Sequence, residues 1–168
     1  MAKEKVDILI VSLHSGEEYA EAPTQFQVEF SKAAIDAGAD FAITQMFFDN
    51  RFYYHFVERA EKVGIHVPII PGIMPITDIG KMKRFSQICG ATLPAHMIER
   101  MEKAASPEEA RKIGIEFAIR QCEDLYRNGV RYFHFYTLNR AEAVTEILST
   151  LNLHPNRCDK TLHYALRA

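Results

Sequence analysis

The sequence contains few cysteines and no long apolar segment. Its three cysteines, Cys89, Cys122 and Cys158, are odd in number and widely spaced, which argues against both a disulfide framework and a zinc cluster, so no bound metal is expected. The longest apolar runs, such as ILIVSL, are far shorter than the ~20 residues needed to span a bilayer, and the charged N-terminal residues MAKEKVD lead straight into a predicted strand. We therefore expect a cytoplasmic protein with no membrane partner.

The sequence also lacks a strong excess of charge of either sign. Its 20 Lys and Arg residues stand against 22 Asp and Glu residues, and both signs are scattered along the chain. Nothing in it resembles the basic stripe that a nucleic-acid-binding protein needs, which excludes that class of partner. What the sequence does have is 48% hydrophobic residues in a chain of 168, which excludes a disordered protein and is enough for the core of one domain.

Four short apolar segments are predicted to form strands. The first, VDILIVSLH, is rich in β-branched residues and shows no polar alternation, which is typical of a strand covered on both faces. The other three are ADFAITQ, HVPIIPGI and RYFHFYTL. The four predicted strands lie at 6–14, 39–45, 66–73 and 131–138.

Helices are expected between these strands, because apolar residues recur at helical spacing and residues typical of helix ends flank them. One helix starts with a capping box, in which Ser106 is the N-cap, Pro107 takes the first helical position and Glu109 reciprocates. The last helix is expected to be capped by Asn139, with Glu142 reciprocating. The predicted helices lie within 22–38, from Asp49 or Asn50 to Gly64, from Thr77 or Asp78 to Gly90, from Ser106 to Asn128-Gly129, and within 140–151.

Strands and helices alternate, with an extra helical hairpin after the third strand. This βαβαβαβα pattern predicts an α/β fold with a parallel sheet and right-handed crossovers. Two architectures fit the four βα units: an open α/β sheet, or half of a (β/α)8 TIM barrel, which normally needs ~250 residues and eight strands. We expect a single α/β domain over 1–155 and a C-terminal tail over 156–168. Ligands bind such folds at the carboxyl ends of the strands, which here carry His14, Gln45, Pro71-Gly72 and Tyr136-Thr137.

Several motifs occur in order and with intact spacing from Ile35 to about Leu153. They are IDAGADFAITQMFFDN, VPIIPGIMPITD, KRFSQICGATLPAHM, GIEFAIRQC and GVRYFHFYTLNRAEA. This part of the chain resembles the C-terminal half of the methylenetetrahydrofolate reductase family. The resemblance implies a (β/α)8 barrel that binds FAD at the carboxyl ends of its strands. It also implies hydride transfer from NAD(P)H to the flavin and then to 5,10-methylenetetrahydrofolate, which gives 5-methyltetrahydrofolate.

The resemblance implies four substrate-binding residues. Gln45 is the counterpart of the family's folate-contacting glutamine, whose amide offers a donor and an acceptor to the edge of a pterin; alternatively it only caps a strand end. Phe85 matches a phenylalanine that stacks on bound ligand, or is a core residue of an amphipathic helix. Arg140 matches a substrate-contacting arginine, or is a solvated charge. Lys81 stands where the family tends to carry glutamine, and would face the anionic folate tail.

The resemblance also implies an incomplete flavin site. The family has a lysine that reaches FAD immediately before the IDAGAD motif, where this sequence has Ala34. The segment 1–34 is similar to the poly-γ-glutamate capsule-synthesis family, metallophosphatase-like proteins with an H-x-G-x-E turn that His14, Gly16 and Glu18 match. The chain is thus interpreted as a junction of two families, and no catalytic or cofactor-binding residue is assigned.

Three functions remain open at this stage. The first is a methylenetetrahydrofolate reductase-related enzyme that needs a second copy to close the half barrel formed by 35–155. The second is a non-catalytic scaffold or half barrel that binds a folate or a flavin and dimerises. The third is the remnant of a metal-dependent phosphoesterase, which would need more ligands than His14 and one carboxylate. A homodimer and a folate-type small molecule are the expected partners.

Overall fold

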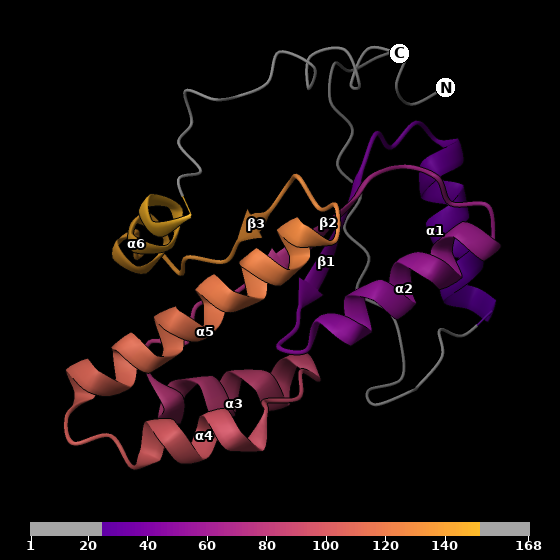
Figure 1. The fold of residues 1–168 in the computed structure, drawn as a ribbon. Helices are drawn as coiled ribbons and strands as arrows, with labels where there is room; N and C mark the ends of the chain where they lie inside the picture. The colour runs from indigo at the N-terminus through magenta and orange to yellow at the C-terminus, as the bar shows by residue number, and fades with distance from the viewer. Residues whose placement is uncertain (1–24, 152–168) are drawn as a thin grey trace.

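The computed structural model describes residues 25–151, which form a three-stranded parallel sheet and six helices (Figure 1). The predicted strand over 6–14 and the predicted tail over 156–168 lie outside the described residues. An α/β fold with parallel strands is confirmed for the part of the chain that is described. The elements follow one another in the order α1 (Gln25–Asp36), β1 (Ala42–Met46), α2 (Asn50–Lys62), β2 (Ile69–Ile73), α3 (Ile79–Cys89), α4 (Ala95–Glu102), α5 (Pro107–Arg127), β3 (His134–Phe135) and α6 (Glu142–Thr150).

The sheet has the strand order β1-β2-β3, and both strand pairs are parallel. Ile43 lies opposite Ile70, and Met46 lies opposite Gly72. Between these two pairs β1 has one residue more than β2. An extra residue of this kind is a β-bulge, which bends the strand and redirects its side chains. The third strand has only two residues where the sequence predicted 131–138, so β3 is much shorter than expected.

Three helices begin where the sequence predicted. Asp49 and Asp78 are the N-caps of α2 and α3, and each accepts a hydrogen bond from a backbone N–H in the first turn. Ser106 caps α5 by accepting from the N–H of Glu109 at 3.2 Å. The Glu109 carboxylate accepts from the N–H of Ala105 rather than from that of Ser106, so the predicted capping box is one residue wider than expected.

The predicted cap of the last helix is wrong. Helix α6 begins at Glu142, its N-cap is Ala141, and no side chain caps it. Asn139 has a φ of 61° and the preceding Leu138 a φ of 48°, so both residues are in the left-handed region. An N-cap residue needs extended backbone, whereas Asn tolerates the left-handed conformation better than most residues. Asn139 therefore shapes the turn between β3 and α6 instead of capping the helix.

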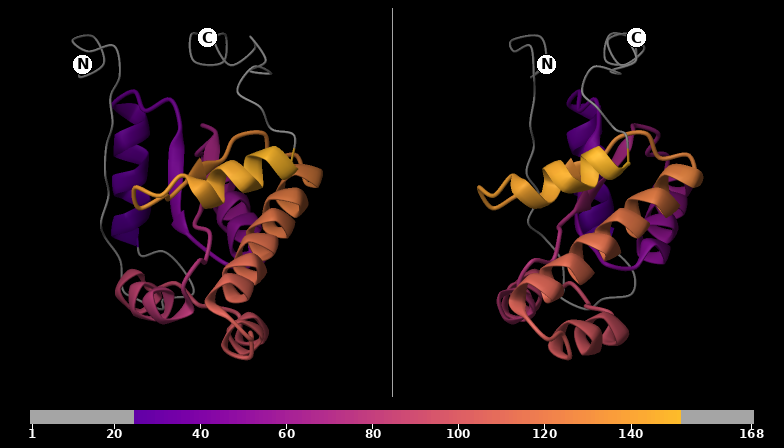
Figure 2. Two further views of the ribbon diagram at one scale, coloured as in Figure 1. Left: turned by 90° about the vertical axis from the view of Figure 1, so that its left-hand side faces the viewer. Right: turned by 60° about the vertical axis from the view of Figure 1, so that its left-hand side comes forward.

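Two clusters of buried side chains hold the helices against the sheet. One is largely aliphatic and joins the strands to α2, α5 and α6. We call it the aliphatic cluster, and its buried residues are Tyr53, Ile73, Ile115, Ala118, Cys122, Leu125, Ala143 and Ile147. The other lies between the carboxyl ends of β1 and β2 and the three helices α3, α4 and α5, and α3 and α4 pack at the N-terminal end of α5 (Figures 1 and 2). We call it the methionine cluster, and it consists of Met46, Phe48, Met74, Ile76, Met82, Met97 and Met101.

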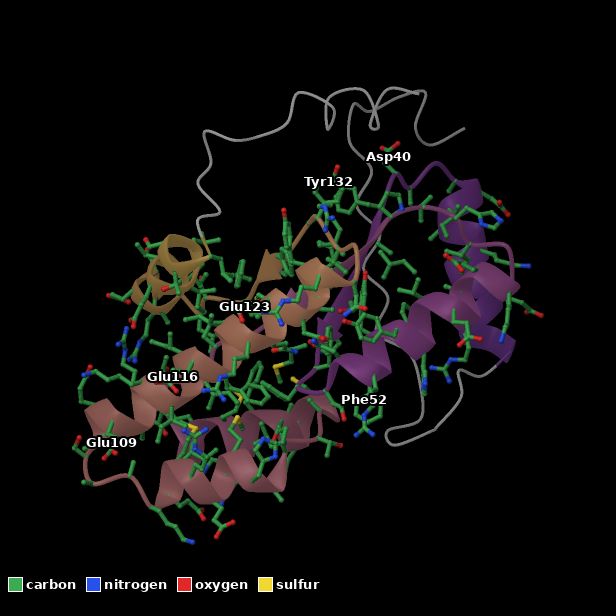
Figure 3. All side chains as sticks on the ribbon, viewed as in Figure 1. Asp40, Phe52, Glu109, Glu116, Glu123 and Tyr132 are labelled. Carbon is green, nitrogen blue, oxygen red and sulfur yellow. The ribbon has the colours of Figure 1, made fainter. Side chains whose placement is uncertain are left out.

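Helix α5 passes close to the segment after β2 because it has a glycine at the crossing. A Cβ at Gly114 would lie 1.7 Å from the carbonyl oxygen of Ile76, so a larger residue does not fit without moving the helix. The outward side of α5 is polar, with Glu109, Glu116 and Glu123 spaced along it (Figure 3). Among residues 25–151 no helix, α5 included, combines the length and the apolar character needed to cross a bilayer.

Candidate functional site

A pocket of about 290 Å³, which we call the carboxyl-end pocket, lies where β2 and β3 end. Its walls come from the segment after β2, helix α3, the turn after β3 and the start of α6. In Figure 3, Asp40 and Tyr132, which precede β1 and β3, mark the opposite, amino end of the sheet. The pocket is thus at the end of the sheet where parallel α/β folds bind ligands. The lining residues that the chemistry depends on are Asp78, Lys81, Phe85, Tyr136, Leu138 and Arg140.

The apolar floor of this pocket belongs to the methionine cluster. Phe85 and Tyr136 are partly buried, pack against that cluster and also line the pocket. Phe85 is therefore a core residue and a pocket residue at once. Met74 and Met82 line the pocket as well, and unbranched methionine side chains adapt to the shape of a neighbouring ring.

Two cations and one carboxylate give the pocket its charge. Asp78 accepts a hydrogen bond from the backbone N–H of Lys81 at 3.0 Å, and its other carboxylate oxygen lies 3.4 Å from the Lys81 ammonium. The bond from this backbone N–H holds the pKa of Asp78 below its ordinary value, so the carboxylate is charged at neutral pH and keeps Lys81 beside the pocket. Arg140 is exposed in the turn before α6, where its backbone N–H donates to the carbonyl of Thr137.

Gln45 lies outside this pocket. It is the fourth residue of β1, its side chain is exposed, and its Oε1 accepts a hydrogen bond from the N–H of Met46 at 3.0 Å. Because the acceptor is turned toward its own strand, the amide nitrogen, a donor, is the group that Gln45 presents outward. The structure therefore brings Lys81, Phe85 and Arg140 together and leaves Gln45 on the neighbouring strand.

Tyr136 is a pocket residue that the sequence marks only as a strand end. Its hydroxyl donates to the carbonyl of Thr44 at 3.0 Å, across a separation of 92 residues in the chain. Its place at the carboxyl end of a predicted strand is the signal that points to it, but no spacing in the sequence reveals its partner. Asp78 was expected only as a helix cap, and the structure adds its contact with the Lys81 ammonium.

The described part of the chain also contains potential metal ligands and a buried thiol. Between residues 25 and 151, no three His, Cys, Asp or Glu side chains come together as a bound metal requires. His14, Gly16 and Glu18 lie outside the described residues. Burial raises the pKa of the Cys122 thiol to about 12, so this group stays protonated and packs in the aliphatic cluster.

Comparison with known proteins identifies the relatives of this chain. The methylenetetrahydrofolate reductase family matches residues 5–152. The 5,10-methylenetetrahydrofolate reductase of Escherichia coli (strain K12) is 42% identical over 125 residues, which are 74% of this chain and 42% of that protein. Methylenetetrahydrofolate reductase (NADH) 1 of Arabidopsis thaliana is 35% identical over 130 residues, 77% of this chain and 22% of the relative. Methylenetetrahydrofolate reductase 2 of Saccharomyces cerevisiae is 36% identical over 141 residues, which are 83% of this chain and 24% of that protein.

The family match corrects the place where the resemblance begins. It starts at residue 5 rather than at Ile35, so it includes nearly all of the segment that was predicted to come from the capsule-synthesis family, and that prediction has no support. A strand, a turn and a helix occur in many parallel α/β folds and do not identify a family by themselves. The chain spans less than half the length of the curated relatives described above. Because the match extends over residues 5–152, the chain belongs to the methylenetetrahydrofolate reductase family.

Proposed function

We propose that the carboxyl-end pocket binds a reduced folate. Through it the chain would take part in the family reaction, the NAD(P)H- and FAD-dependent reduction of 5,10-methylenetetrahydrofolate to 5-methyltetrahydrofolate. One observation carries the proposal: Lys81, Phe85 and Arg140, each expected at the substrate from the resemblance, line one pocket. They come from α3 and from the turn before α6, segments that are far apart in the sequence.

Each of these side chains suits one part of a folate. The ring of Phe85 offers an apolar face on which an aromatic pterin or aminobenzoyl ring stacks. The cations of Lys81 and Arg140 suit the carboxylates of the glutamate tail, since an arginine binds a carboxylate through two parallel N–H donors. Gln45 would contact the edge of the pterin from β1 with its outward amide nitrogen. All four roles are binding roles, and we assign proton transfer to none of these residues.

We assign no flavin site to the described residues. The pocket of about 290 Å³ is at the lower limit of the ~300–1,000 Å³ typical of sites for drug-sized ligands, which suits a ring system. Ala34 stands where the resemblance places a lysine that reaches FAD, and its methyl group donates no hydrogen bond. FAD supplies hydride transfer when it is bound. We assign no step of that transfer to residues 25–151.

We also infer that the reduction requires a completed barrel. Within the described residues β1 and β3 each pair with a strand on one side only, whereas a (β/α)8 barrel closes through eight strands. A homodimer whose two copies cover each other's sheet edges would remove these open edges. Light scattering at micromolar concentration tests this arrangement. A monodisperse monomer with edge-strand amides protected from hydrogen exchange would contradict it.

Titration with 5-methyltetrahydrofolate, followed by NMR, tests the folate proposal. We expect resonances of Phe85 and of the turn around Arg140 to shift at sub-millimolar ligand. Arg140→Gln should weaken binding about three- to tenfold, because it removes one charge-assisted pair at an exposed position. Arg131→Gln is the matched control, since Arg131 is an exposed arginine at the amino end of the sheet, stacked over the ring of Tyr126. Its replacement should leave the affinity unchanged.

Two results would change this proposal. Resonances that stay unmoved at millimolar ligand would contradict folate binding and leave the non-catalytic scaffold as the function of this pocket region. A chain that purifies as a monomer with a flavin spectrum and oxidises NADH would show instead that one copy contains a complete active site.

A further inference from the structure

Two hydrogen bonds at Thr44 hold the part of β1 that leads into Gln45. This part lies at the bulge, where the regular pairing with β2 is interrupted. Thr44 Oγ1 accepts a hydrogen bond from the N–H of Gly72 at 2.9 Å, and the Thr44 carbonyl accepts from the Tyr136 hydroxyl at 3.0 Å. Bulges leave a residue unpaired and are frequent where a strand redirects a side chain beside a functional site. Both bonds act on Thr44, whose carbonyl belongs to the peptide unit that leads into Gln45.

Tyr136 reaches Thr44 by crossing the middle strand of the sheet. The crossing point is Gly72, in β2, which lies between β1 and β3. A Cβ at Gly72 would lie 2.7 Å from Cε2 of Tyr136 and 2.5 Å from the Thr44 carbonyl oxygen. Glycine is therefore what lets the phenol ring approach the backbone here. His134 supports the ring edge-on, with the two ring centroids 4.7 Å apart.

The same ring is part of the carboxyl-end pocket. Tyr136 lines it together with Phe85 and Arg140. Because a peptide unit is planar, a bond that fixes the Thr44 carbonyl also fixes the direction in which the chain enters Gln45. One side chain thus connects the two parts of the proposed folate site that the structure otherwise keeps apart.

We propose that Tyr136 is a positioning residue for folate recognition, which holds Gln45 at a set place relative to the carboxyl-end pocket through its bond to Thr44. The proposal rests on the proposed function, since Gln45 is a folate contact only there. Burial raises the pKa of the Tyr136 phenol, so its hydroxyl remains a donor throughout the neutral pH range.

A pair of matched variants tests this role. Tyr136→Phe removes the hydroxyl and keeps the ring. Tyr53→Phe is the control, because the Tyr53 hydroxyl also donates to a backbone carbonyl, that of Ile69 at 2.7 Å, at the amino end of β2. We expect Tyr136→Phe to weaken binding of 5-methyltetrahydrofolate about three- to tenfold, the range that one net hydrogen bond supports, and Tyr53→Phe to change it by less than about twofold.

The variant Gln45→Ala shows whether the effect passes through Gln45. In that background, Tyr136→Phe should weaken binding by less than about twofold, because the residue that Tyr136 positions is already truncated. Equal weakening by the two Tyr→Phe variants would overturn the proposal, since it would show a general loss of stability. An undiminished effect of Tyr136→Phe in the Gln45→Ala background would also overturn it.

NMR of the ligand-free chain separates failure of this inference from failure of folate binding. Tyr136→Phe should shift the side-chain NH2 resonances of Gln45 and speed hydrogen exchange of the Gly72 amide, and Tyr53→Phe should do neither. If these changes occur but no folate binds, the proposed function fails and the positioning contact stands. If folate binds and the Gln45 resonances do not move, the positioning role fails and folate binding stands.

Discussion

The two ends of the sheet each carry a pocket, and the two pockets differ in size and charge. The amino-end pocket, of about 540 Å³, lies between α2, the start of β2 and the loop before β3. The carboxyl-end pocket has about half that volume, about 290 Å³. The charged residues of the amino-end pocket are Glu58, Glu61 and Arg131, whereas the carboxyl-end pocket has two basic residues and one acid. An anionic ligand such as a folate therefore suits the smaller of the two.

Several polar groups at the amino end already take part in holding the fold together. Tyr53 donates to the backbone of β2 and Tyr54 to the carboxylate of Asp124, each at 2.7 Å. Arg131 donates to the carbonyl of Tyr126 and lies 4.4 Å from the centre of its ring. At the carboxyl end the side chains of Lys81, which is paired with Asp78, and of Arg140 are exposed beside an apolar floor. Ligand sites typically combine an apolar lining with a few convergent polar groups, and the carboxyl-end pocket has both.

The largest expected difference is in stability, and substitution of one glycine on each side of the molecule tests it. Gly114→Ala would place a methyl group 1.7 Å from the carbonyl oxygen of Ile76, and should lower the free energy of unfolding by about 3 kcal/mol or more, the upper range for overpacking. Gly129→Ala, beside the amino-end pocket, meets nothing within 4 Å and should cost only about 1 kcal/mol for its φ of 93°. Urea unfolding measures both. Equal losses would show that α5 shifts away from Ile76 without cost.

The second largest expected difference between the two ends is in ligand affinity. Phe85→Ala is expected to weaken binding of 5-methyltetrahydrofolate about tenfold, because it removes the ring that we expect to stack on the ligand. Tyr132→Ala removes an aromatic ring from the amino-end pocket and should leave the affinity unchanged. Isothermal titration calorimetry measures the affinities, and melting curves check that both variants are folded. A larger loss for Tyr132→Ala would place the ligand at the amino end.

Helix ends were largely predictable because they depend on residues that are close in sequence. Asp49, Asp78 and Ser106 cap their helices through bonds that span two or three residues, so residue type and spacing were sufficient. Asn139 followed by Glu142 has the same pattern, but there two consecutive left-handed residues make a turn, and the pattern gave the wrong cap. The short β3 has a similar cause, since the length of a strand depends on the pairing that its neighbour offers.

The resemblance named Lys81, Phe85 and Arg140 as candidate site residues, but residue spacing alone brings together only those that are close in sequence. Lys81 and Phe85 lie four residues apart on α3, so their shared face follows from helical geometry. Arg140 joins them from another segment, and its place in the same pocket comes from the structure. The bond from Tyr136 to Thr44 connects residues 92 positions apart, and no periodicity encodes such a contact.

The smallest effect is expected from the hydrogen-bond network between α2 and α5. The Asp124 carboxylate accepts from Asn50 Nδ2 and from the Tyr54 hydroxyl, each at 2.7 Å. The bond from Asn50 first, and then that from Tyr54, hold the pKa of Asp124 below its ordinary value of 3.8. The folded chain therefore binds this proton less readily than the unfolded chain does. The stabilisation is present at neutral pH and is lost as the pH falls below about 4.

Asp124→Asn should lower the free energy of unfolding by at most about 1 kcal/mol at neutral pH, since Asp124 is exposed and its hydrogen bonds compete with water. The difference from the unaltered chain should shrink as the pH falls below about 4, because protonation of the Asp124 carboxylate then removes the charge that the substitution removes. Thermal unfolding across this pH range measures it. Because Tyr54 lines the amino-end pocket, the affinity for 5-methyltetrahydrofolate should stay unchanged at neutral pH. A weaker affinity would show that the two ends of the sheet are coupled through α2 and α5.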